Sequence, residues 1–348
     1  MKKFKRIREW VQIPGSFAPG PRNSITDVPG VTVGQVTVKK PGVCTGVTVI
    51  SPALGDVFAN PLPGAVAVGN GFGKLAGALQ VEELGHIESM IGLTNTLSVA
   101  AVMQGLIDYH APKMPAGRES INVIVGETND SRLNDIRGCH ITPAHVAEAI
   151  AALSKDVQEG GVGAGAGTVC FGFKGGIGTS SRMVPGAVSG EERDYTVGAL
   201  VQSNYGGNFN IYGKPVQKKP FVTNDIAIAD SDSKDGSCMI VILTDAPLSA
   251  LQLKRVAKRG LIGMTNTGSY MSHGSGDLAI AASNHEKNRG NDYAHGRDYY
   301  FLSDSQLNPF FEATAEAVQE ALYNSLTMAA GTERDGTIYP GFDFEVLM

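Results

Sequence analysis

Apolar positions along the chain form short runs bounded by glycine, proline, asparagine or aspartate, and the runs rich in Val and Ile predict β-strands. The predicted strands are Gly30–Val38, Val43–Ile50, Gly64–Val68, Ile121–Gly126, Val197–Gln202, Cys238–Leu243 and Asp277–Ala282. Longer segments predict helices over Thr96–His110, Thr142–Ser154, Pro247–Gly260 and Asn308–Ala329. Because strands and helices do not alternate as a regular βαβ repeat, we expect an α+β fold with layers of sheet covered by helices.

Local signals sharpen some of these boundaries. Thr142 and Pro143 place a capping hydroxyl and a proline at the start of one helix, and Asp245 with Pro247 predicts the start of another in the same way. The polar segment Tyr212–Asp235 predicts a long exposed loop. It ends at Gly236.

The Gly236–Ser237 bond lies where this polar segment changes into the apolar run Cys238–Leu243, which is typical of a strand buried on both faces. A hydroxyl at that position can attack the preceding carbonyl, convert the amide to an ester and release a new amino terminus. The freed Ser237 would combine a nucleophile with an α-amino base whose ordinary pKa is about 7.7–8.0. The dipeptide alone does not distinguish self-cleavage from an ordinary turn, since Gly-Ser occurs three more times.

Composition narrows the class of protein. The chain has 348 residues, enough for one large domain or two, and its 44 glycines predict many tight turns and close backbone contacts. A net charge of −5 without a basic stripe argues against a nucleic-acid partner. No apolar run predicts a membrane span, the basic start is not followed by a signal-peptide core, and four scattered cysteines indicate a reducing compartment. We therefore expect a cytoplasmic protein that needs neither metal nor cofactor.

Several familiar motifs do not fit. No Gly-x-Ser-x-Gly elbow is present, and His140 and His145 lack the intervening residues of a zinc motif, so His145 is interpreted as a helix-start residue. His273 lies beside candidate chemistry and is interpreted as a loop residue. The glycine-rich runs 160–167 and 172–182 match no phosphate-binding pattern, and we favour close backbone packing over nucleotide binding.

Polar side chains also follow or precede other predicted strands. Ser275 and Asp277 come before one strand and face the same side of an extended segment, which allows a polar relay as well as a self-bonded turn. Asn204 ends a second strand and can donate to an oxyanion or cap a turn. Glu127 ends a third, where a carboxylate can hold a substrate ammonium or bond the turn. We expect these strand ends and Gly236–Ser237 to form one rim of a sheet.

Taken in order, a set of segments resembles the L-aminopeptidase/D-esterase (DmpA-type) and β-aminopeptidase family over nearly the whole chain. The segments are Asn23–Gly30, Gly46–Ile50, Gly126–Asp130, Leu133–Ile136, Gly172–Arg182, Val201–Asn204, Thr244–Leu248 and Gly274–Asp277. The resemblance implies an αββα sandwich and a self-processed hydrolase of the N-terminal-nucleophile type, cut into residues 1–236 and 237–348. It also implies a symmetric homo-oligomer of the resulting αβ units, a tetramer of heterodimers.

By matching positions, the resemblance implies that Ser237 is the nucleophile, Ser275 and Asp277 its relay, and Asn204 an oxyanion donor. One position departs from the family, whose members tend to carry a tyrosine just before the Leu-Asn-Asp segment. Here Ser131-Arg132 precedes Leu133, and a fixed positive charge that points inward would repel an ammonium and favour a carboxylate or a different amide.

The reaction expected is acyl transfer. Ser237 attacks a small amide, ester or short peptide that bears a free amine, and water resolves the acyl-enzyme. Two alternatives stay open: a hydrolase of non-peptide oligoamides built from aminoalkanoates, and a glycine-rich module that binds phosphate or nucleotide and stays uncut.

Overall fold

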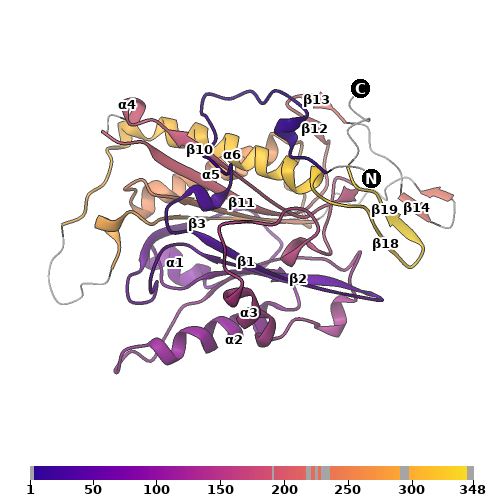
Figure 1. Ribbon diagram of the computed structural model, residues 1–348, viewed down its shortest axis with the longest axis horizontal. Helices are drawn as coiled ribbons and strands as arrows, with labels where there is room; N and C mark the ends of the chain where they lie inside the picture. The colour runs from indigo at the N-terminus through magenta and orange to yellow at the C-terminus, as the bar shows by residue number, and fades with distance from the viewer. Residues whose placement is uncertain are drawn as a thin grey trace.

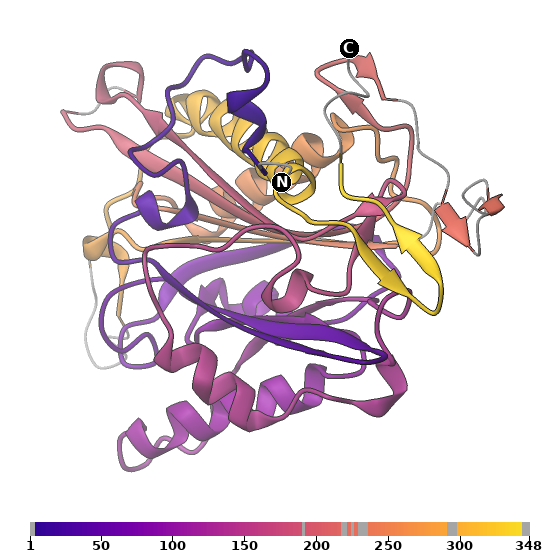
Figure 2. The same ribbon diagram turned by 45° about the vertical axis from the view of Figure 1, so that its right-hand side comes forward.

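The computed structural model describes residues 4–189, 192–216, 221–223, 226–228, 236–290 and 298–342. Two β-sheets lie face to face between two layers of helices (Figures 1 and 2). Helices α5 (Ala250–Thr265) and α6 (Asn308–Thr327) cover one sheet, and α2 (Val99–His110) and α3 (Pro143–Ala151) cover the other. The predicted α+β class and the αββα sandwich implied by the family resemblance are both confirmed.

The sheet under α5 and α6 has six strands and carries the Gly236–Ser237 bond at the start of an inner strand. Its order is β10 (Ile177–Val184), β11 (Tyr195–Asn204), β16 (Ser237–Thr244), β17 (Gly276–Ser283), β3 (Leu62–Gly71) and β5 (His86–Ile87). Strand β16 is antiparallel to β11 and parallel to β17. The end of β11 therefore meets the starts of β16 and β17, and Ser237 is opposite Asn204 on one side and Gly276 on the other.

The second sheet brings one more strand end to this place. Its order is β1 (Thr32–Lys40), β2 (Val43–Ser51), β6 (Ile91–Asn95), β7 (Ile124–Thr128) and β4 (Leu75–Ala76). Strand β7 packs against β16: Gly126 lies against the side chain of Met239, which a Cβ at Gly126 would displace. The end of β7 thus lies beside Ser237.

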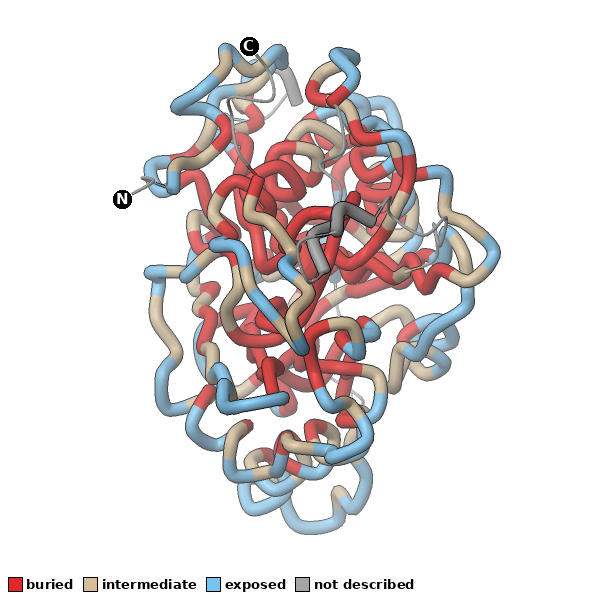
Figure 3. Tube along the Cα trace, turned by 90° about the vertical axis from the view of Figure 1, so that its right-hand side faces the viewer, coloured by how far each residue is buried: buried red, intermediate tan, exposed pale blue. Residues whose placement is uncertain are grey.

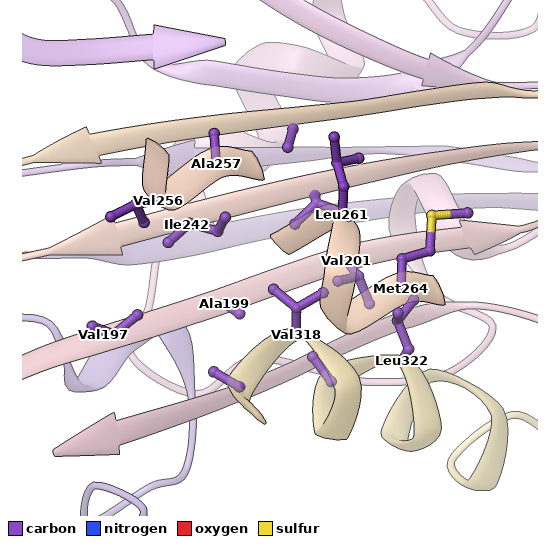
Figure 4. Packing of buried hydrophobic residues seen from close by; sticks show 14 of the residues in the cluster. Val197, Ala199, Val201, Ile242, Val256, Ala257, Leu261, Met264, Val318 and Leu322 are labelled. Carbon is purple, nitrogen blue, oxygen red and sulfur yellow. The ribbon is translucent and has the colours of Figure 1, made fainter. Parts of the chain in front are cut away.

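Strand β16 is buried on both faces, as its continuous apolar sequence predicts. Cys238, Ile240 and Ile242 belong to the core between the sheet and α5 and α6, whereas Met239, Val241 and Leu243 belong to the core between the two sheets. Figure 4 shows the helix-side core, with Ile242 and residues of β11 packed against α5 and α6. Buried residues fill the centre of the molecule and exposed ones its outside (Figure 3). The start of β16 is therefore held in a rigid frame.

All predicted strands and helices are present, with shifts of a few residues at their ends. Helix α3 begins at Pro143 after Thr142, as expected. The predicted helix start at Asp245 and Pro247 is wrong, because α5 begins at Ala250 and Ser249 accepts a hydrogen bond from the Gln252 N–H. Asp245 instead accepts a hydrogen bond at 2.7 Å from the Thr196 N–H near the start of β11.

The segment Tyr212–Asp235 is not simply a long exposed loop. It contains β13 (Lys214–Pro215), β14 (Phe221–Thr223) and β15 (Ile226–Ile228), and β14 pairs with β19 (Thr337–Tyr339). The rest of that prediction, at 217–220, 224–225 and 229–235, lies outside the described residues.

The glycine-rich runs pack backbone against backbone, as favoured above. A Cβ at Gly165 would collide with Ile177 N, and a Cβ at Gly178 with the Ala321 carbonyl of α6. Strand β10 was not predicted, because the glycines in and before it are not typical of a strand, and it is part of this packing. The remaining short elements in the described residues are α1 (Ala78–Leu84), α4 (Gly186–Ser189), β8 (Val169–Cys170), β9 (Phe173–Lys174), β12 (Asn210–Ile211), β18 (Thr332–Arg334) and seven short 3-10 helices.

Candidate active site

The hydroxyl of Ser237 points into the space between the two sheets, and its residue is only 3% exposed. Its Oγ accepts a hydrogen bond at 3.2 Å from the backbone N–H of Asn129, just beyond β7. It accepts a second at 3.3 Å from Nδ2 of Asn204, at the end of β11. Two N–H donors from two different sheets thus converge on one hydroxyl.

Gly236 brings the backbone close enough for this arrangement. Its carbonyl accepts a hydrogen bond at 3.1 Å from the N–H of Gly276 on β17. Any Cβ at position 236 would collide with the backbone of Asn204 and Tyr205. Only glycine therefore allows the chain to enter β16 along this path, with its carbonyl bonded to β17.

The side chain of Asn204 is fixed by three hydrogen bonds. Its Oδ1 accepts from the N–H of Val169 at 3.0 Å. Its Nδ2 donates to the carbonyl of Asn129 at 2.9 Å and to Ser237 Oγ at 3.3 Å. Because a backbone donor engages the carbonyl oxygen, the NH2 group must face Ser237, as a preorganised oxyanion donor requires.

Ser275 and Asp277 form a buried pair behind this site. Oγ of Ser275 donates to Oδ1 of Asp277 at 2.9 Å, and within the described residues Oδ2 of Asp277 has no hydrogen-bond partner. Burial raises the pKa of Asp277 to about 6, although the hydrogen bond from Ser275 acts in the opposite direction. Asp277 is in register with Cys238, so this pair sits next to the backbone of Ser237.

Glu127, the carboxylate of the site, is 3% exposed at the end of β7. Its Oε1 accepts from the N–H of Lys74 at 2.8 Å and lies 3.9 Å from the Lys74 Nζ. The Lys74 Nζ also donates to Oγ1 of Thr96 at 2.6 Å. Burial raises the pKa of Glu127, and the hydrogen bond from Lys74 opposes that shift. The carboxylate is therefore desolvated and already has one cation beside it.

A cavity of about 710 Å³ joins these groups, a size suited to a small ligand. Its lining residues are Phe72, Lys74, Thr96, Leu97, Glu127, Asn129, Ser131, Arg132, Asn204, Gly236, Ser237, His273 and Gly274. Arg132 lines the cavity, and within the described residues no hydrogen bond or ion pair of its side chain is found.

The structure brings the residues predicted from sequence together in two groups. Gly236, Ser237, Asn204, Glu127 and Arg132 line the cavity. Ser275 and Asp277 hydrogen-bond to each other, and within the described residues neither bonds to Ser237 Oγ.

Sequence reasoning missed the N–H of Asn129 and the cation Lys74. A backbone donor leaves no signature in residue type, and Lys74 lies far from the other site residues in the chain. Phe72 and Leu97, which form part of the cavity wall, were also not predicted.

Other expectations concern the histidines, metal binding and membrane spans. Nδ1 of His145 accepts from the N–H of Thr142 at 3.1 Å, which confirms a helix-start residue. His273 lies in the loop before β17 and lines the cavity. In the part of the chain that the structure describes, no group of three or more metal-binding side chains is found. No described helix combines the length and apolar character needed to cross a membrane.

Comparisons with known proteins agree with this geometry. The family model for peptidase family S58 matches residues 23–338. The chain is 36% identical over 340 residues to the β-peptidyl aminopeptidase BapA of Sphingosinicella microcystinivorans, covering 91% of this chain and 84% of that one.

Two solved structures share the fold. A β-aminopeptidase of Burkholderia sp. has 36% identity and a TM-score of 0.88, with 99% of this chain and 97% of that chain covered. The L-aminopeptidase D-Ala-esterase/amidase of Ochrobactrum anthropi, described as a variant of the Ntn-hydrolase fold, has 31% identity and a TM-score of 0.83, with 98% and 96% covered.

These matches confirm the resemblance inferred from the sequence motifs, together with its fold and its enzyme class, a peptidase of the serine aminopeptidase type. The chain belongs to peptidase family S58.

Proposed function

We propose that the protein cuts its own chain between Gly236 and Ser237 and then acts as an aminopeptidase with Ser237 as the N-terminal nucleophile. In the first reaction, Oγ of Ser237 attacks the Gly236 carbonyl carbon, and the C–N bond breaks as its nitrogen takes up a proton. Water hydrolyses the resulting ester. The products are a chain ending in the Gly236 carboxylate and a chain beginning with the Ser237 amine. The observation that supports this is that the Ser237 hydroxyl and the Gly236 carbonyl before it are each held by hydrogen bonds from neighbouring segments.

In turnover, the α-amino group of Ser237 takes the proton of Oγ as Oγ attacks the substrate carbonyl. The oxyanion receives hydrogen bonds from Nδ2 of Asn204 and the N–H of Asn129, which both point at Ser237 Oγ in the uncut chain. The amine or alcohol leaves with a proton, and water releases the acyl group. Ser275 and Asp277 lie beside the backbone of Ser237 and orient the new amine.

For the substrate, Glu127 binds the free ammonium, because it is the only carboxylate that lines the described cavity. The relatives named β-peptidyl aminopeptidase support substrates with an N-terminal β-amino acid. Oligoamides of aminoalkanoates bear the same two groups and stay an alternative. The phosphate-binding alternative loses support, since close backbone contacts fill the space around the glycines.

The experiment is a comparison of a β-aminoacyl p-nitroanilide with its N-acetylated form, using wild type and Ser237→Ala. We expect wild type to release nitroaniline only from the free amine, and Ser237→Ala to release none. Equal turnover of the acetylated compound would contradict aminopeptidase action, because that compound lacks the ammonium.

Two further expectations from the sequence stay predictions: the homo-oligomer of αβ units and the cytoplasmic location. Size-exclusion chromatography with light scattering tests the first, and fractionation of the source cells tests the second.

A further inference from the structure

The charged groups that line the described cavity do not balance. Lys74 and Arg132 are cations, and Glu127 is the one carboxylate. Lys74 is already engaged, because its Nζ donates to Thr96 and lies 3.9 Å from Glu127. The guanidinium of Arg132 therefore remains as a positive charge without a described partner, on the wall of a cavity that must accept a substrate.

The backbone around Arg132 is held in place on both sides. The N–H groups of Leu133 and Asn134 both donate to the Asp130 carbonyl at 3.0 Å. Nη1 of Arg334 donates to the carbonyls of Ser131, at 2.6 Å, and Asn134, at 2.7 Å.

The neighbouring side chains anchor the same segment. Leu133 and Asn134 are both buried, and Nδ2 of Asn134 donates to Oδ1 of Asp130 at 3.0 Å. The start of the Arg132 side chain is thus fixed, which lowers the entropic cost of binding an anion there.

Charge decides which end of a substrate each group can meet. Glu127, the one carboxylate of the described cavity, suits the ammonium, whereas Arg132, a cation on the same cavity wall, repels it. An ammonium at Glu127 belongs to the acyl part of the substrate. The group left for Arg132 is then on the leaving amine, and the planar guanidinium is best matched by a carboxylate.

We propose that Arg132 binds the carboxylate of the leaving amino acid, so that the preferred substrates are unprotected dipeptides, with an ammonium at one end and a carboxylate at the other. This rests on the proposed aminopeptidase function. A longer peptide or a C-terminal amide places a neutral amide where the dipeptide has its carboxylate and leaves Arg132 unmatched.

The test compares kcat/KM for β-alanyl-L-alanine and β-alanyl-L-alaninamide, which differ only in that carboxylate, and repeats it with L-alanyl-L-alanine and its amide. A charged hydrogen bond predicts a preference of about 10- to 100-fold for the free acid in wild type. Arg132→Met is expected to remove the preference by slowing only the acid. Arg137→Met is the matched control, because Arg137 lies on the same segment, is exposed and does not line the cavity.

A denaturing gel of Arg132→Met shows whether its chain is still processed. If it is not, Arg132→Lys is used instead and is expected to reduce the preference, because Lys keeps the charge and loses the fork. An equal rate for acid and amide in wild type overturns the proposal while aminopeptidase function stands. The proposal is also overturned if the preference for the free acid survives in Arg132→Met, or if Lys74→Met removes that preference instead. Failure of wild type on all four compounds overturns the aminopeptidase function itself.

Discussion

Asn204 and Ser237 lie directly opposite each other in the antiparallel pair of β11 and β16, with Nδ2 of Asn204 3.3 Å from Oγ of Ser237. The register of two buried strands, rather than a flexible loop, sets this distance. In the proposed mechanism, an oxyanion that forms at Ser237 would meet a donor that needs no reorganisation.

Removing that donor should slow the reaction without unfolding the protein. We expect Asn204→Ala to lower kcat by about 10²–10³, the usual cost of losing one oxyanion donor. Asn208→Ala is the control, since Asn208 is exposed and does not line the active-site cavity. Steady-state kinetics and a melting curve check both variants, and near-normal turnover by Asn204→Ala would remove Asn204 from the mechanism.

Self-cleavage should require glycine at position 236, because there is no room for a side chain there. In Gly236→Ala, the new Cβ collides with the backbone of Asn204 and Tyr205, so the Gly236 backbone must move from the position in which Gly276 holds its carbonyl. We expect this variant to remain a single chain on a denaturing gel. Gly71→Ala, on β3 of the same sheet, adds a Cβ that meets only Val68 Cγ1 at 3.7 Å and should be cut normally. Normal cutting of Gly236→Ala would contradict the close approach.

Glu127 should act on substrate binding more than on chemistry. Glu127→Gln is expected to raise KM for substrates with a free amine about tenfold or more, the value of a charged hydrogen bond, with kcat little changed. Since burial raises the pKa of Glu127, KM should begin to rise at a higher pH than for an ordinary glutamate as pH falls. Glu83→Gln, at an exposed position outside the cavity, is the control. An unchanged KM would place the ammonium elsewhere.

Asp277 should make the folded state less stable as pH rises. Its folded pKa of about 6 lies above the ordinary value of 3.8, so the folded state holds the proton more tightly than the unfolded state. The charged carboxylate then costs up to roughly 3 kcal/mol above pH 6, and this cost disappears below about pH 4. In the Ser237→Ala chain, Asp277→Asn should therefore raise the free energy of unfolding more at pH 8 than at pH 4. Urea unfolding at both values measures this, and the same effect at both would refute the buried charge.

Much of this fold can be predicted from sequence because β16 and its neighbouring strands are buried and therefore have continuous apolar sequences. The apolar run Cys238–Leu243 is typical of a fully buried strand, and a strand that begins at Ser237 places that residue at the strand end. The polar residues Asn204 and Glu127 end buried strands, as expected, but the prediction of one rim of a single sheet is wrong for Glu127, because β7 belongs to the other sheet. The order of the family motifs implied the αββα layers and the roles expected of the site residues.

The features that could not be predicted from the sequence depend on contacts between distant segments. The N–H of Asn129 reaches Ser237 only because β7 and β16 pack from different sheets. Asp245 resembles a helix cap in sequence, but in the fold its carboxylate accepts a hydrogen bond from the Thr196 N–H instead. Strand β10 lies within a glycine-rich run whose composition suggests a loop, while α6 packs so closely on Gly178 that no side chain fits there.

The central claim is that Ser237 becomes a chain terminus, and intact-mass spectrometry of the purified protein under denaturing conditions tests it most directly. We predict two species in wild type, residues 1–236 and 237–348, the second with a free serine amine, and one uncut, inactive chain in Ser237→Ala. A wild-type protein that hydrolyses amides while all of it retains the mass of the 348-residue chain would contradict the account.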